Sequence, residues 1–327
     1  MPGAGALMLR HGGNVVGFVA TVIAIERAVA IRGAVAFAAP VFSAACGLTL
    51  IAGAPPPFAS LLAAMAGTAY TLNMLLLLKR HGTLPLAAMS IGGFCLAVSG
   101  IVWWHTGTIG AVIPWWVAFL TLTIAAERLE LLRFQRTSTV GILHAAFAAL
   151  LLILGPVVSL VQPLIGNPLL GAGLVAAAAW LVVRDVPRRT LRTEGLSRFI
   201  GFGLAIGYAW LTVAGVLLLI GGLSSGGVLY DATIHAFFIG FVFSAIMAHE
   251  PIIAPSVTGL SFAYTPLFYA PLALLQGALA VRVGADIATQ AELRRWSGLV
   301  QFIAILLFMA LSARSVLLAR RRGGSAT

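Results

Sequence analysis

The chain has 327 residues, of which 61% are hydrophobic and 9% are charged. A soluble protein of this length carries about 25% charged residues, because its surface must be solvated. The composition therefore excludes a soluble globular fold and predicts an integral membrane protein. The chain has twenty basic and nine acidic residues, which gives a net charge of +11. In a soluble protein, this charge would indicate a nucleic-acid partner.

Eleven apolar stretches are long enough to cross a bilayer, since a helical span needs about 20 residues. Clusters of Pro, Gly and charged residues separate them. We expect an all-α, polytopic membrane helix bundle that forms a single transmembrane domain over residues 1–327. The predicted spans are 11–31, 34–53, 57–78, 83–103, 109–126, 140–161, 163–183, 199–222, 232–254, 262–281 and 297–317.

The basic residues gather on one side of these spans. Sixteen of the twenty follow odd-numbered spans, and four lie on the opposite side. Because cytoplasmic loops are enriched in Lys and Arg, we expect an inner (cytoplasmic) membrane protein with its N-terminus outside and its C-terminus in the cytoplasm. The net charge is then an orientation signal, and no nucleic-acid partner is expected. No cleavable signal peptide is indicated before the first span.

Three of the predicted spans share a pattern. FVATVIAIER, from position 18, matches FLTLTIAAER, from position 119, and HGGNVVGFV, from position 11, matches HAFFIGFV, from position 235. In each span the residue eight positions after a phenylalanine is polar. These three residues are Glu26, Glu127 and His249. The pattern predicts internal helical repeats with a polar group at the same inner depth.

The ninth span, YDATIHAFFIGFVFSAIMAHEPIIAP, contains His235 and His249. In a regular α-helix, residues fourteen apart lie about 40° apart around the axis and about 21 Å apart along it. We therefore expect both imidazoles on one face near opposite membrane surfaces, the spacing at which one helix ligates two stacked haems in b-type cytochromes. Gly240 would let a macrocycle edge or another helix approach. The alternative is two interfacial histidines on a tightly packed helix.

Other histidines at matching depth are candidate partners. At the outer level, His11 pairs with His235 on a haem, or His11, His105 and His235 bind copper, because imidazole suits both metals. At the inner level, His144 pairs with His249. The sequence alone does not decide between these ligand sets.

Four acidic residues lie near or within spans, where a charged group is costly and indicates function by default. Glu26 and Glu127 are interpreted either as proton-handling groups or as partners, with the adjacent arginines, in a packing salt bridge between repeated helices. Asp231 is expected to N-cap the ninth span or to accept a hydrogen bond from an imidazole. Glu250 is followed by Pro251, which is expected to end or kink the helix.

The segment HAFFIGFVFSAIMAHEPIIAP resembles the His-bearing helices of the NnrS family of haem- and copper-containing membrane proteins, and more distantly the ligand helices of haem-copper oxidase subunit I. The resemblance implies a multi-span protein with b-type haem, linked to electron transfer or the nitric oxide response, and it extends to His11, His235 and His249. Oxidases have a His-Pro-Glu motif where this chain reads His249-Glu250-Pro251, so oxygen reduction is not implied. Related families commonly have twelve spans, so the resemblance implies one further helix before His11.

Three hypotheses about function follow. The first is a haem protein, with copper as an additional metal. The second is a proton-coupled secondary transporter of a small solute, in which Glu26, Glu127 and His249 handle protons around a midplane cavity. The third is an assembly factor of a membrane redox complex, with structural histidines. Nucleotide-binding, HExxH and Ser/His/Asp patterns are missing from the sequence, which disfavours a nucleotide-driven or hydrolytic enzyme.

Overall fold

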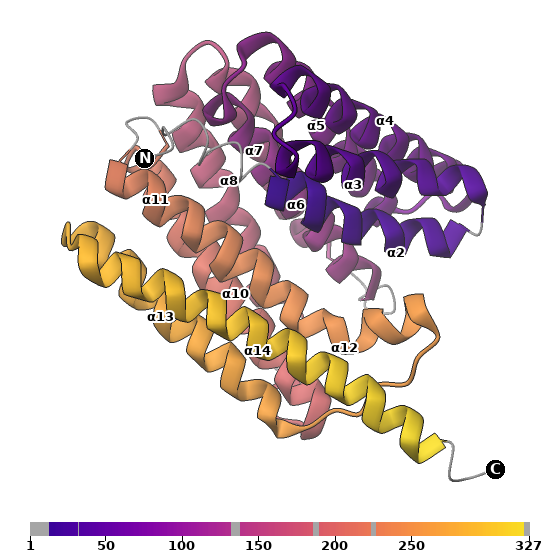
Figure 1. The fold of residues 1–327 in the computed structure, drawn as a ribbon. Coiled ribbons are helices and arrows are strands. Elements are labelled where there is room, and N and C mark those ends of the chain that lie inside the picture. The colour runs from indigo at the N-terminus through magenta and orange to yellow at the C-terminus, as the bar shows by residue number, and fades with distance from the viewer. Residues whose placement is uncertain (1–12, 32, 132–137, 186–189, 224–226, 324–327) are drawn as a thin grey trace. The chain divides into compact units, whose positions relative to one another are not determined.

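The computed structural model describes residues 13–31, 33–131, 138–185, 190–223 and 227–323. All regular elements in these ranges are helices, and no strand occurs in them (Figure 1). Ten helices in these ranges are long and apolar enough to cross a membrane. The predicted all-α helix bundle is therefore confirmed.

The helices follow one another with short connections, and their bounds agree with the predicted spans to within seven residues. The elements are η1 (Gly13–Ala20), α2 (Thr21–Ile31), η2 (Ala34–Phe37), α3 (Ala38–Ile51), α4 (Pro56–His81), α5 (Leu84–Thr106), α6 (Ile109–Leu131), α7 (Thr139–Ser159), α8 (Pro163–Arg184), α10 (Gly195–Leu219), α11 (Gly227–His235), η3 (Ala236–Phe243), α12 (Ser244–Thr258), η4 (Pro266–Phe268), α13 (Tyr269–Ile287) and α14 (Ala291–Gly323).

Proline and glycine set several of these bounds. The helix α4 starts at Pro56 and ends before Gly82, whose φ is +64°. In α5, Pro85 lies in the first turn and Gly107, also at φ +64°, follows the last residue. Proline fits the first turn because the N–H that it lacks has no partner there, and glycine adopts the left-handed conformation that closes a helix. These residues explain why the predicted span limits are close to the observed ones.

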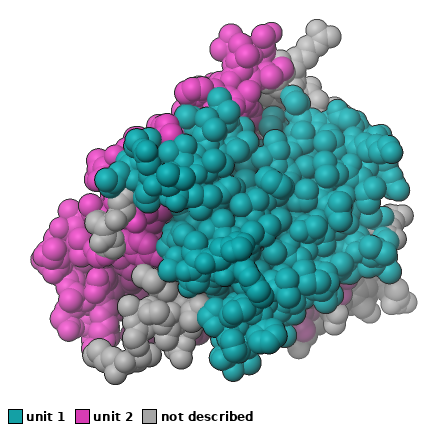
Figure 2. All heavy atoms as spheres, turned by 90° about the horizontal axis from the view of Figure 1, so that it is seen from above, with its two compact units in different colours: residues 1–136, 149–166 teal, residues 137–148, 167–327 magenta. Residues whose placement is uncertain are grey.

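The chain divides into two compact units, residues 1–136 with 149–166 and residues 137–148 with 167–327 (Figure 2). Unit 1 contains the helices from η1 to α6, and unit 2 those from α10 to α14, while α7 and α8 contribute to both. The candidate carboxylates Glu26 and Glu127 therefore belong to unit 1, and the histidines His235 and His249 belong to unit 2.

Unit 1 is held together by close approaches of helix backbones. A Cβ atom on Gly67 of α4 would lie 2.2 Å from the backbone nitrogen of Ala97 in α5, and one on Gly100 of α5 would lie 2.3 Å from that of Ala64 in α4. Small residues allow such contacts, and they are the usual means of packing helices within a membrane.

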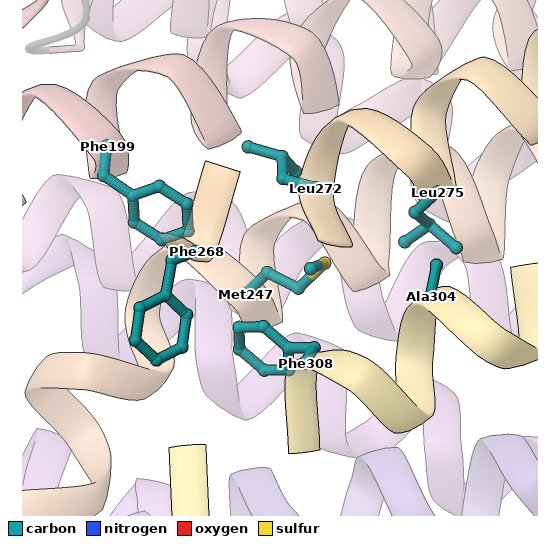
Figure 3. Packing of buried hydrophobic residues seen from close by; sticks show 7 residues of the cluster. All are labelled: Phe199, Met247, Phe268, Leu272, Leu275, Ala304 and Phe308. Atoms are coloured by element: carbon teal, nitrogen blue, oxygen red, sulfur yellow. The ribbon is translucent and has the colours of Figure 1, made fainter. Parts of the chain in front are cut away.

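Unit 2 has an apolar core between α10, α12, α13 and α14 (Figure 3). Its aromatic members include Phe199, which packs edge-on against Tyr269 with ring centroids 5.3 Å apart. The fully packed cluster comprises Phe199, Met247, Phe268, Leu272, Leu275, Ala304 and Phe308. This core fixes α12, the helix that carries His249, against its neighbours.

The predicted repeat reappears as a shared irregularity of the backbone. The segments η1 and η3 are both π-helical, have eight residues each and are offset by 223 residues at both ends. The same offset relates Gly17 to Gly240 and Glu26 to His249. π-Helical segments are rare, and those that occur are often found at functional sites. The equivalent positions of η1 and η3 therefore support the repeat. In the third copy, α6, Pro114 lies 101 residues after Gly13, the first residue of η1. A proline also removes a helix hydrogen bond.

Candidate functional site

The two histidines of the ninth predicted span make the same local contact. The Nδ1 atom of His235 lies 2.8 Å from the carbonyl oxygen of Asp231, and that of His249 lies 2.7 Å from the carbonyl oxygen of Ala245. Because a carbonyl oxygen only accepts, Nδ1 is the donor in both rings, and in the neutral imidazole the lone pair is then on Nε2. Metal-binding histidines commonly donate one N–H to a carbonyl in this way.

The predicted common face of these histidines rests on a regular α-helix, and that assumption is wrong. The segment η3, which directly follows His235, is π-helical. A π-helix has i→i+5 hydrogen bonds and more residues per turn than an α-helix. The rotation between His235 and His249 therefore differs from the roughly 40° of a regular helix, so a shared face no longer follows from their spacing.

Gly240 serves the approach of another helix. A Cβ atom at this position would lie 2.4 Å from Cγ and 2.5 Å from Cβ of Trp210 in α10. The indole fills the space that glycine leaves, so of the two predicted roles the structure supports helix packing, and a macrocycle edge has no room over Gly240.

The remaining candidate histidines differ in their surroundings. His105 is exposed at the C-terminal end of α5 in unit 1, His144 is half-buried in the part of α7 that belongs to unit 2, and His11 lies outside the described residues. Across the described ranges, no group of three or more His, Cys, Asp or Glu side chains is arranged to hold a metal ion. The copper site of His11, His105 and His235 thus stays a prediction, as does the pairing of His144 with His249.

Asp231 is part of a charged cluster in unit 2. It lies inside α11, four residues after the start of the helix, so the predicted N-cap is wrong. Its carboxylate accepts hydrogen bonds from Nε and Nη2 of Arg282 at 3.1 and 3.2 Å, and Oδ1 lies 3.5 Å from Nδ1 of His235. Nearby on α13, the fully buried carboxylate of Asp286 lies 3.7 Å from Nη1 of Arg294. This cluster fixes the start of the helix that carries His235.

Glu250 lies in the middle of a helix. The helix α12 continues through Pro251 and Pro255 to Thr258, so Pro251 does not end the helix, and of the two predicted effects only the kink stays a prediction. The Oε2 atom of Glu250 is buried and has no hydrogen-bond partner. Burying this oxygen atom without a hydrogen-bond partner costs free energy of folding.

Arg27 joins three carboxylates in unit 1. Its Nη2 atom lies 3.0 Å from Oε1 of Glu26 and 3.5 Å from Oε1 of Glu127, and its Nη1 atom lies 3.0 Å from Oε2 of Glu130. We call these four residues the Arg27 cluster. Since Arg27 and Glu127 come from two of the repeated helices, the predicted salt bridge between repeats is confirmed.

Four residues at these sites are not indicated by the sequence patterns. Tyr70 and Thr123 adjoin the Arg27 cluster, and each is an ordinary member of an apolar span. Arg282 and Asp286 were expected in or near a loop, yet α13 extends to Ile287. Their spacing of four residues, which is typical of a charged pair on one helix face, is the signal that could have found them.

The fold and its buried polar groups define a multi-pass membrane protein built from apolar helices. The chain belongs to the family described as "Domain of unknown function (DUF8744)", whose model matches residues 4–317. No curated protein and no solved structure matches the chain.

Proposed function

We propose that this protein is a membrane haem protein in which His235 and His249 ligate b-type haem, with a role in electron transfer or the nitric oxide response. The observation that carries the proposal is the pair of Nδ1–H···O=C bonds, which leave the lone pair of each neutral ring on Nε2. This is the tautomer that a histidine needs in order to bind iron through Nε2.

Haem and copper need different numbers of ligands from the protein. A haem iron takes one or two protein ligands, because the porphyrin supplies the other four, whereas a histidine-bound copper site needs about three ligands from the protein. The predicted copper set supplies three such ligands, His11, His105 and His235, of which His11 lies outside the described residues. His235 and His249 lie on opposite sides of the eight-residue segment η3 along one continuous helix. They are therefore too far apart along its axis to share one iron, so each histidine would ligate its own haem.

The absorption spectrum of the purified protein tests this proposal. The wild-type protein is expected to show a Soret band, the His235→Ala and His249→Ala variants are each expected to lose about half of it, and the double variant nearly all. His81→Ala is the matched control, since His81 is exposed at the end of α4. An undiminished Soret band in the folded double variant would overturn the proposal.

A variant of His105 distinguishes haem binding from copper binding in the same experiment. If copper binds through His11, His105 and His235, His105→Ala lowers the bound copper and leaves the Soret band unchanged. A membrane redox complex is the proposed partner, because an electron carrier must exchange electrons with another protein.

We also propose the inner membrane orientation with the N-terminus outside and the C-terminus in the cytoplasm, supported by the distribution of the basic residues. Alkaline phosphatase, which is active only outside the cytoplasm, is expected to be inactive when fused to the C-terminus. The same enzyme inserted after Gly107, in the connection between α5 and α6, is expected to be active. The reverse pattern of activities would contradict this orientation.

A further inference from the structure

The Arg27 cluster has more negative than positive charge. Three carboxylates surround one guanidinium, which leaves two negative charges when all four groups are ionised. The side chains of Arg27 and Glu127 are only 11% and 13% exposed, whereas that of Glu130 is 42% exposed. Buried excess charge is costly, so this arrangement calls for a positive ligand. Glu130 provides contact with the surroundings.

Polar atoms beside the cluster are buried without a hydrogen-bond partner. They include the hydroxyl of Tyr70 and that of Thr123, whose residues are 2% and 0% exposed, as well as Oε1 of Glu127 and Nε of Arg27. The hydroxyl of Tyr70 interacts electrostatically with Arg27 and Glu127 and lies beside that of Thr123. Donors and acceptors thus gather beside the cluster, where Oε1 of Glu127 has only its 3.5 Å contact with Arg27. Such a group marks a site for water or another small polar ligand.

Two adjacent glycines of α5 allow these hydroxyls to reach the cluster. A Cβ atom on Gly93 would lie 2.6 Å from Cδ1 of Tyr70, and one on Gly92 would lie 2.9 Å from Oγ1 of Thr123. The Tyr70 ring is also fixed edge-on against Phe119, with centroids 6.0 Å apart. The backbone of α5 is therefore shaped around both side chains, so their polar atoms are held in place by packing.

From this geometry we propose that the Arg27 cluster, together with Tyr70 and Thr123, is a water-containing proton-binding site with Glu127 as the group that takes up the proton. A hydronium ion transfers its proton to Glu127, which forms one O–H bond and releases one water molecule. The net charge of the cluster then falls from two negative charges to one. Water connects the protonated carboxyl to the hydroxyls of Tyr70 and Thr123.

Each of the other residues has a defined part in this site. Arg27 holds Glu26 and Glu130 by direct ion pairs of 3.0 Å, while its 3.5 Å contact with Glu127 is longer and weaker. The half-exposed Glu130 gives protons access to the cluster. Every residue of this site belongs to unit 1, and the proposed haem ligands belong to unit 2.

Infrared difference spectra of the full-length protein in liposomes, recorded between alkaline and neutral pH, test the proposal. We expect a carboxylic acid C=O band that appears on acidification and disappears in the isosteric Glu127→Gln variant. In Tyr70→Phe, which removes one hydroxyl, the band should remain but shift in frequency, because a hydrogen-bond partner of the acid is lost. Glu292→Gln, in the exposed first turn of α14, should leave the band unchanged.

Two results would overturn the proposal. One is a wild-type spectrum without a carboxylic acid band over this pH range, and the other is a band that persists unchanged in Glu127→Gln. Circular dichroism and size-exclusion chromatography verify that the variants fold. If Glu127→Gln does not fold, Tyr70→Phe decides, since an unshifted band in that variant contradicts the placement of the acid beside Tyr70.

Discussion

The substitution Gly67→Ala is expected to destabilise unit 1 by about 3 kcal/mol, the upper end of the usual cost of overpacking. The added methyl group would lie 2.2 Å from the backbone nitrogen and 2.6 Å from the Cα atom of Ala97. Both are backbone atoms, which cannot turn away as a flexible side chain does. The helices α4 and α5 must therefore separate. Unfolding in sodium dodecyl sulfate, followed by circular dichroism, measures the loss.

Gly110 supplies the matched control for this variant. It lies in α6 of the same unit, and nothing lies within 4 Å of the position that its Cβ atom would take. Gly110→Ala is expected to be neutral or to stabilise the helix by up to about 1 kcal/mol. Equal losses in the two variants would show that close packing of α4 on α5 is not the cause.

Replacing Arg27 with alanine is expected to cost about 3–5 kcal/mol of stability, because it leaves buried carboxylates without their cation. Glu26, Glu127 and Glu130 all lie within 3.5 Å of the guanidinium, and the two nearest the interior are mostly buried. The same unfolding experiment applies. Arg80→Ala is the control, since Arg80 is exposed at the end of α4.

A second substitution separates the effect of charge from that of lost packing. In the Arg27→Ala background, Glu127→Gln removes one of the repelling carboxylates and should restore part of the lost stability. The two changes contact each other, so their effects are expected to be non-additive. Strict additivity would mean that the ion pair of 3.5 Å between them contributes nothing.

Much of the fold could be predicted from the sequence, because a bilayer span leaves a strong signal. A helix that crosses lipid must be apolar over about 20 residues, and prolines and glycines such as Pro56 and Gly107 mark where helices begin and end. The π-helical segments η1 and η3 could not be predicted. Apolar residues fit an α-helix and a π-helix equally well, and neighbouring helices decide between the two hydrogen-bond patterns.

The candidate sites were predictable only where a residue type repeats along the chain. The shared pattern of Phe18 and Phe119 led to Glu26 and Glu127, and the structure joins these two through Arg27. The partner of Asp231 was not predictable, because Arg282 is 51 residues away. The residues around Asp231 favour an N-cap role, whereas tertiary packing places it inside α11 and against a distant arginine.

A pyridine haemochrome assay tests haem binding through His235 and His249 most directly. The full-length protein is purified from membranes of cells supplied with haem. We expect the spectrum of b-type haem, with about one haem for each of the two ligating histidines. A folded, colourless preparation without haem iron would contradict it.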